Sequence, residues 1–119
     1  MKKIVVKFGG SNVKTGEDIS RLLHVIRLYN RPLVIVVSAL FGITDILAKM
    51  IHMVKINEYA VSRVKRKLLD AHSHIVNLYI GDKKKREIIL EKIKQRVEEL
   101  EKYLLGIHYL GEIPDFAED

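Results

Sequence analysis

Two short segments of the sequence combine glycine with hydroxyl side chains, and one of them adds a basic side chain, as phosphate-binding loops do. The first covers residues 7–13 and reads Lys-Phe-Gly-Gly-Ser-Asn-Val. Gly9 and Gly10 have no Cβ, so a ligand can approach the backbone, and successive N–H groups in such a turn form a concave anion site. Lys7 adds a positive charge beside the turn. The segment predicts an anion-binding loop, although a glycine turn that only reverses the chain would have the same sequence.

The second segment covers residues 36–45 and reads Val-Val-Ser-Ala-Leu-Phe-Gly-Ile-Thr-Asp. Ser38 and Thr44 offer hydroxyl groups, and the start of the helix that follows offers backbone N–H groups to an anion. In a purely structural alternative, Thr44 or Asp45 caps that helix. The sequence contains neither the P-loop nor the dinucleotide-binding glycine pattern, so neither of those nucleotide sites is supported.

A strand, a helix and a second strand must position these two segments. Ile4–Phe8 is rich in β-branched residues and ends in glycine, and Leu33–Val37 is apolar without alternation, which is typical of a parallel strand buried on both faces. Between them, Thr15 and Asp18 have the spacing of a capping box that starts a helix. The arrangement predicts a βαβ unit with both loops at the carboxyl ends of the strands, where α/β folds bind ligands.

Apolar residues at spacings of three and four predict three further helices, over residues 43–54, 61–78 and 89–104. We expect Gly81 to close the middle one and Asp82 to cap the next, which makes the last two helices an antiparallel hairpin. Gly106 is expected to end the last helix, because residues 107–119 show no periodicity. The fold class is therefore α/β and helix-rich.

Composition limits the remaining possibilities. The chain has 119 residues, a net charge of +6 and no cysteine, so it holds one domain at most and has no disulfides, cysteine metal sites or thiol nucleophile. The five histidines have no metal-ligand spacing. The apolar runs are too short to span a membrane or to form a signal peptide, which predicts a cytoplasmic protein.

Taken together, three blocks of the sequence resemble aspartokinases. Residues 7–13 resemble the Lys-Phe-Gly-Gly-Thr-Ser-Val opening of that family. Residues 36–45 resemble its Val-Val-Ser-Ala block followed by Gly-(Ile/Val)-Thr-Asn. Residues 110–115, Leu-Gly-Glu-Ile-Pro-Asp, resemble the Leu-Gly-Glu-x-(Thr/Pro)-Asp region after its helical hairpin. Ser11 stands where the family has Thr, and Asn12 stands where it has Ser.

The resemblance implies an amino-acid-kinase-like three-layer fold and a reaction. The parent enzyme transfers the γ-phosphoryl group of ATP, bound with Mg²⁺, to the side-chain carboxylate of L-aspartate, on the route to lysine, threonine and methionine. Lys7 would act catalytically by neutralising charge on that group. By resemblance, the ATP phosphates would be bound by Lys7, Gly9, Gly10 and Ser11, and the substrate by Ser38 and Thr44.

Aspartokinases are several hundred residues long, so the resemblance implies that residues 1–119 are the N-terminal portion of the catalytic domain, inactive alone. A two-stranded parallel sheet has two open edges, so we expect a homo-oligomer. We expect no membrane partner. Basic clusters at residues 63–67 and 83–86 leave a nucleic-acid-binding domain as an alternative, disfavoured because acidic residues share the same helices. A non-catalytic helical interaction module is a further alternative, as is an amino-acid kinase acting on glutamate or uridylate.

Overall fold

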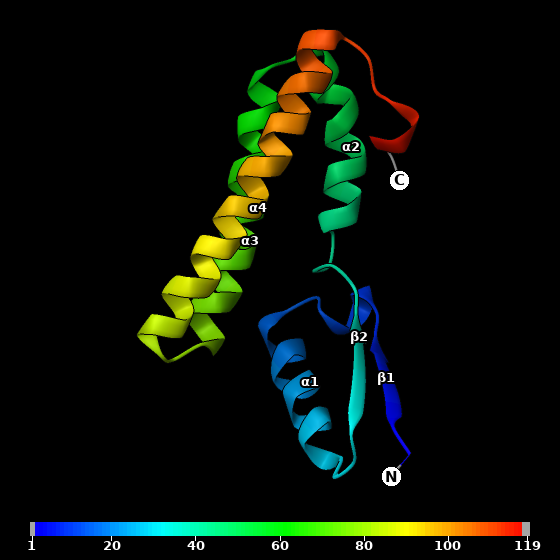
Figure 1. The fold of residues 1–119 in the computed structure, drawn as a ribbon, viewed down its shortest axis with the longest axis vertical. Helices are drawn as coiled ribbons and strands as arrows, with labels where there is room; N and C mark the ends of the chain where they lie inside the picture. The colour runs from blue at the N-terminus through cyan, green and yellow to red at the C-terminus, as the bar shows by residue number, and fades with distance from the viewer. Residues whose placement is uncertain (1, 118–119) are drawn as a thin grey trace. The chain divides into compact units, whose positions relative to one another are not determined.

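The computed structural model describes residues 2–117, without the side chain of Ser11. The chain divides into two compact units, Met1–Thr44 and Asp45–Asp119. The first unit contains a small parallel sheet and one helix, and the second is helical (Figure 1). The predicted helix-rich α/β class is confirmed.

The first unit is the predicted βαβ arrangement. Strand β1 (Ile4–Phe8) is followed by a short 3-10 turn, η1 (Gly10–Asn12), helix α1 (Gly16–Leu28) and strand β2 (Leu33–Val37). The strands pair in parallel, with Phe8 opposite Val37 at their carboxyl ends. Because the strands are parallel, the segments that follow β1 and β2 leave the sheet at the same edge.

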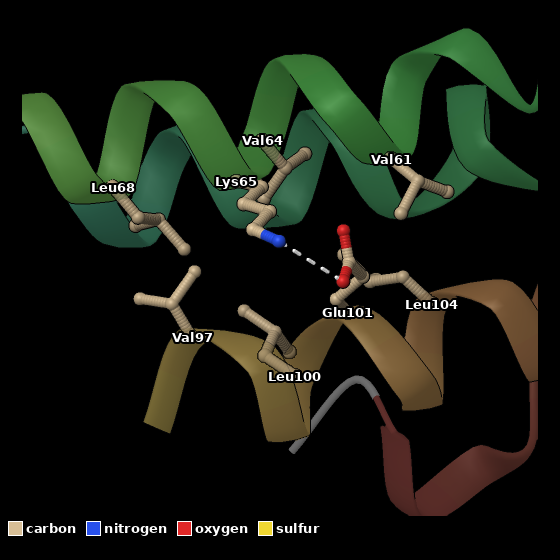
Figure 2. A pocket seen from close by; sticks show the side chains of 8 residues that line it. All are labelled: Val61, Val64, Lys65, Leu68, Val97, Leu100, Glu101 and Leu104. Atoms are coloured by element: carbon tan, nitrogen blue, oxygen red, sulfur yellow. Dashed lines mark hydrogen bonds and ion pairs between the residues drawn. The ribbon is translucent and has the colours of Figure 1, made fainter. Parts of the chain in front are cut away.

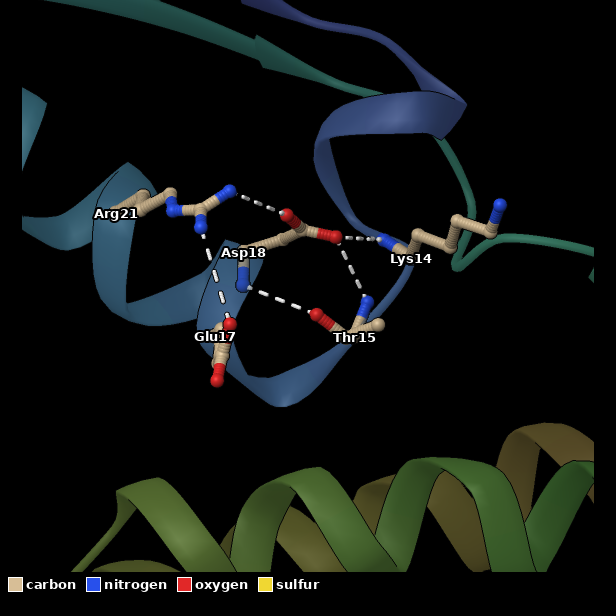
Figure 3. Close-up of polar contacts among 5 residues, drawn as sticks. All are labelled: Lys14, Thr15, Glu17, Asp18 and Arg21. Carbon is tan, nitrogen blue, oxygen red and sulfur yellow. Dashed lines mark hydrogen bonds and ion pairs between the residues drawn. The ribbon is translucent and has the colours of Figure 1, made fainter.

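Helix α1 begins with the predicted capping box (Figure 3). The Asp18 N–H donates to Thr15 Oγ1 at 3.4 Å, and Asp18 Oδ2 accepts from the N–H groups of Thr15 at 2.9 Å and Lys14 at 3.0 Å. Arg21 lies 3.6 Å from the other carboxylate oxygen. The Thr15 N–H, with smaller effects from Lys14 and Arg21, lowers the pKa of the Asp18 carboxyl below its ordinary value. These bonds satisfy N–H groups that the start of the helix would otherwise leave free.

The prediction that β2 is buried on both faces is wrong for the described residues. The side chains from Val34 to Val37 are 42–57% exposed. The sheet has only two strands, so one edge of β2 is open, and its apolar residues are only partly covered. An apolar sequence shows that a strand is suited to burial, but whether it is buried depends on the elements that pack against it.

The second unit is built on the predicted antiparallel hairpin. Helix α2 (Ile43–Ile56) leads from the first unit into the second and is followed by α3 (Tyr59–Tyr79) and α4 (Lys83–Leu110). Figure 2 shows the apolar side chains that interlock between α3 and α4, leaving no space for a water molecule: Val61, Val64, Leu68, Val97, Leu100 and Leu104. Lys65 Nζ and Glu101 Oε1 form an ion pair at 3.2 Å beside them. The hairpin therefore has its own dry core.

Helix α4 continues past Gly106, so the predicted helix end is wrong. It ends at Leu110, and Gly111 follows with a left-handed backbone (φ 67°) and donates its N–H to Ile107 and His108. Gly is strongly favoured at this position because it adopts positive φ without strain. Gly106 is an interior helix residue instead, at a cost of about 1 kcal/mol relative to alanine.

Long-range contacts stabilise the added turn of α4. Ile107 is buried, and the His108 ring donates its Nδ1–H to the Val54 carbonyl at 2.9 Å. That carbonyl lies in the last turn of α2, where helix carbonyls lack intrahelical partners. The Tyr109 hydroxyl donates to Glu58 Oε1 at 2.9 Å, and this raises the pKa of the Tyr109 phenol. Contacts to the α2–α3 junction thus offset the presence of Gly106.

The link between α3 and α4 matches the prediction in part. Asp82 caps α4, since its Oδ1 accepts from the Lys85 N–H at 3.1 Å. Gly81 directly follows Ile80, the C-cap residue of α3, as predicted for a glycine that closes this helix, although positive φ is confined to Gly42 and Gly111 among the described residues. Leu78, the last apolar residue in the spacing that predicts α3, is 58% exposed, whereas Val76 is buried.

Candidate functional site

The two loops singled out in the sequence meet at the carboxyl edge of the sheet. The Ser38 N–H donates to the Phe8 carbonyl at 3.0 Å, which extends the strand pairing by one bond. A Cβ placed on Gly10 would lie 3.8 Å from Ser38 Oγ. Further along, the Phe41 N–H donates to the Val13 carbonyl at 3.1 Å. Residues about 30 positions apart in the sequence are therefore in direct contact.

The glycine turn after β1 is held by three hydrogen bonds. The Asn12 and Val13 N–H groups donate to the carbonyls of Gly9 and Gly10, at 2.9 and 3.2 Å. The Gly9 N–H donates to Asn12 Oδ1 at 3.1 Å. These three bonds do not involve the N–H groups of Gly10 and Ser11. Of the two glycines expected to contact phosphate, Gly9 thus has its donor already used within the turn.

Side chains around this edge lie as follows. Lys7 is exposed on β1, two residues before the turn, and forms no ion pair with a described residue. Ser38 is exposed, and its hydroxyl donates to the neighbouring Ala39 carbonyl at 2.7 Å. Ser11 contributes its backbone to η1, whereas its side chain lies outside the described structure. The predicted residues Lys7, Gly10 and Ser38 are thus brought to one edge of the sheet.

Thr44 lies beyond the second loop, at the start of α2. Gly42 has φ 82°, a value that favours glycine, and α2 begins at the next residue, Ile43, which is buried. Thr44 and Asp45 therefore lie inside the first turn of the helix and do not occupy its cap position. Thr44 is exposed.

The comparison with protein families identifies the family of this chain. The model of the amino acid kinase family matches residues 2–108. The chain belongs to the amino acid kinase family. The match includes the whole βαβ unit, both loops and almost all of the helical hairpin.

Family membership assigns kinase chemistry to this chain, that is, transfer of a phosphoryl group. Amino acid kinases need groups that orient and neutralise phosphates, because phosphoryl transfer depends chiefly on positioning and electrostatics. The carboxyl edge of the β1–β2 sheet carries the Lys7 ammonium, the glycine turn and the Ser38 hydroxyl.

Sequence reasoning missed one contact between the loops. The Lys14 ammonium lies 4.8 Å from the centre of the Phe41 ring, a cation–π geometry. Lys14 follows the first loop and Phe41 lies in the second, so the pair reinforces the Phe41–Val13 backbone bond. No sequence spacing signals this contact, since only the pairing of the strands brings the two residues together.

The described residues do not fit a metal site held by the protein. None of them form a group of three or more histidine, aspartate or glutamate side chains able to hold an ion. Within residues 2–117, no helix has the length and apolar character needed to span a membrane.

Proposed function

We propose that this amino acid kinase transfers the γ-phosphoryl group of ATP to the side-chain carboxylate of L-aspartate. A carboxylate oxygen attacks the γ-phosphorus, the bond between that phosphorus and the β–γ bridging oxygen breaks, and ADP leaves. The product is an acyl phosphate, 4-phospho-L-aspartate. The aspartokinase-like blocks at residues 7–13, 36–45 and 110–115 favour aspartate over the glutamate and uridylate acceptors that share a similar glycine opening.

The observation that carries the proposal is the contact between the two loops. Ser38 Oγ lies 3.8 Å from the Cβ position of Gly10, so groups from the first two aspartokinase-like blocks lie close together at the carboxyl edge of the sheet. In this proposal Lys7 neutralises charge on the transferring group, and the N–H groups of Gly10 and Ser11 bind phosphate oxygens. Ser38 and Thr44 contact the substrate.

We further propose that residues 1–119 form the N-terminal portion of the catalytic domain and do not complete the reaction centre alone. The apolar side chains of β2 support this, because Val34 to Val37 are about half exposed and such a strand is normally covered by further layers. The open edge of β2 is likewise a place for another strand to pair.

Trapping with hydroxylamine tests the acceptor, because acyl phosphates form hydroxamates and phosphate monoesters do not. The protein encoded by the whole reading frame is incubated with MgATP, hydroxylamine and L-aspartate, L-glutamate or UMP. We expect hydroxamate and ADP with L-aspartate, and no turnover by the 119-residue chain alone. Equal activity with L-glutamate, or ADP release with UMP and no hydroxamate, would contradict the assignment.

Two substitutions connect that assay to the described edge. Lys7→Met removes the charge and should lower kcat by roughly 10²–10³, the usual cost of losing one electrostatic donor. Gly10→Ala adds a methyl group at an ordinary contact distance from Ser38, so the fold should persist while KM for ATP rises. Gly81→Ala is the matched control, because its Cβ would meet no atom within 4 Å and it lies in the hairpin link. Wild-type kinetics for Lys7→Met would refute the proposed role of this edge.

A further inference from the structure

One of the donors in the glycine turn is already occupied by a side chain of the turn itself. Asn12 Oδ1 accepts from the Gly9 N–H at 3.1 Å. An amide oxygen in this place accepts the same hydrogen bond that a phosphate oxygen would accept. A phosphate can therefore use the Gly9 N–H only after the Asn12 side chain releases it.

The backbone of the turn does not depend on that side chain. Two backbone bonds close it, from Asn12 to Gly9 and from Val13 to Gly10. Two further backbone bonds connect the flanking segments to the second loop, from Ser38 to Phe8 and from Phe41 to Val13. Asn12 is exposed, so its side chain fills no core. Removing the amide should thus free the Gly9 N–H without unfolding the turn.

We propose that Asn12 regulates phosphate binding as a built-in competitor for the Gly9 N–H. In the unsubstituted protein, the N–H groups of Gly10 and Ser11 bind the phosphate. The affinity for a polyphosphate is therefore lower than it would be if the Gly9 N–H were a third donor. Asn12 acts through Gly9 and is thus a positioning residue. This inference rests on the proposed function, because it concerns the same phosphate-binding loop.

The expected gain is that of one hydrogen bond. Asn12→Ala should tighten polyphosphate binding by about two- to tenfold, the range that corresponds to a single net hydrogen bond. Asn12→Asp keeps an acceptor oxygen for the Gly9 N–H and adds negative charge, so it should weaken binding. Opposite effects of the two substitutions separate competition from a general loosening of the turn, which would weaken binding in both variants.

The test uses the ¹⁵N-labelled protein encoded by the whole reading frame, with tripolyphosphate and MgATP as separate probes followed by amide NMR shifts. In the unsubstituted protein, the amide signals of Gly10 and Ser11 should shift when the probe binds, and the amide signal of Gly9 should not. In Asn12→Ala the Gly9 signal should also move, Kd should fall, and the Gly9 amide should exchange with solvent faster before any ligand is added. Asn30→Ala is the matched control, an exposed asparagine in the turn between α1 and β2.

The outcomes separate the two proposals. In one outcome, Gly10 and Ser11 respond to tripolyphosphate, but Asn12→Ala leaves the Gly9 signal and Kd unchanged or raises Kd. Asn12 is then not a competitor, and only this inference fails. If Asn12→Ala does not fold, movement of the Gly9 signal in Asn12→Asp would overturn the inference, because the acceptor oxygen remains there. If no amide of the loop responds in any variant, the phosphate-binding role fails and takes this inference with it.

Discussion

Replacing Gly106 and Gly111 by alanine, one at a time, should change the stability of the helical unit in opposite directions. Both glycines lie near the end of α4, and a Cβ on either would meet no atom within 4 Å. Steric contact with residues outside the local backbone therefore contributes to neither substitution. The difference between them is in the backbone, since Gly106 lies inside the helix and Gly111 has φ 67°.

The magnitudes follow from that difference. An alanine inside a helix is about 1 kcal/mol more favourable than a glycine, so Gly106→Ala should raise the free energy of unfolding by that amount. A left-handed backbone destabilises an alanine by about 1–2 kcal/mol. Alanine also lowers the conformational entropy of the unfolded chain, which stabilises the folded state by about 0.4–1 kcal/mol. Gly111→Ala should therefore lower the free energy of unfolding by about 1 kcal/mol.

Urea unfolding of each variant, followed by circular dichroism at 222 nm, measures both effects. For a unit of this size, 1 kcal/mol corresponds to a change in Tm of about 4–8 °C. Gly111→Asn is a useful companion, because asparagine tolerates the left-handed region and should lose less than alanine. Destabilisation by Gly106→Ala, or stabilisation by Gly111→Ala, would refute the reasoning and restore Gly106 as the end of the helix.

Two further predictions concern the cap of α1 and the core of the hairpin. Because the pKa of Asp18 is lower in the folded chain, its charged form stabilises the fold above about pH 4 and this contribution is lost as the pH falls through the folded value. Asp18→Asn should therefore lower the free energy of unfolding at pH 7 but not in acid. The control Glu17→Gln removes only an exposed ion pair with Arg21 and should change the free energy of unfolding little at either pH. Equal losses at both pH values for Asp18→Asn would contradict this reasoning. Leu68→Ala should cost about 2–5 kcal/mol in urea unfolding because Leu68 is buried between α3 and α4, and exposed Leu78→Ala should cost far less. Similar losses for the two leucines would show that the hairpin core is placed wrongly.

Much of this architecture could be predicted because its signals are local. The glycine after β1, the Thr15–Asp18 spacing and the three- and four-residue periodicity of the helices each depend on a few neighbouring residues. The meeting of the two loops was also predictable, since parallel strands place their carboxyl ends at one edge. Asn12 shows the limit, because its spacing does not reveal that its side chain accepts from the Gly9 N–H and occupies a donor expected for phosphate.

The sequence by itself determined the strands, the helices, the glycine turn and the kinship with kinases, because these depend on short-range patterns of residue type. Only the tertiary structure decided where α4 ends, since Gly106 lowers local helix propensity and the helix continues through contacts such as His108 with Val54, 54 residues away. It also decided that β2 is exposed, because burial is a property of the neighbouring layers and not of the strand. Local sequence sets the preference of each segment, and packing between distant segments determines which preferences prevail.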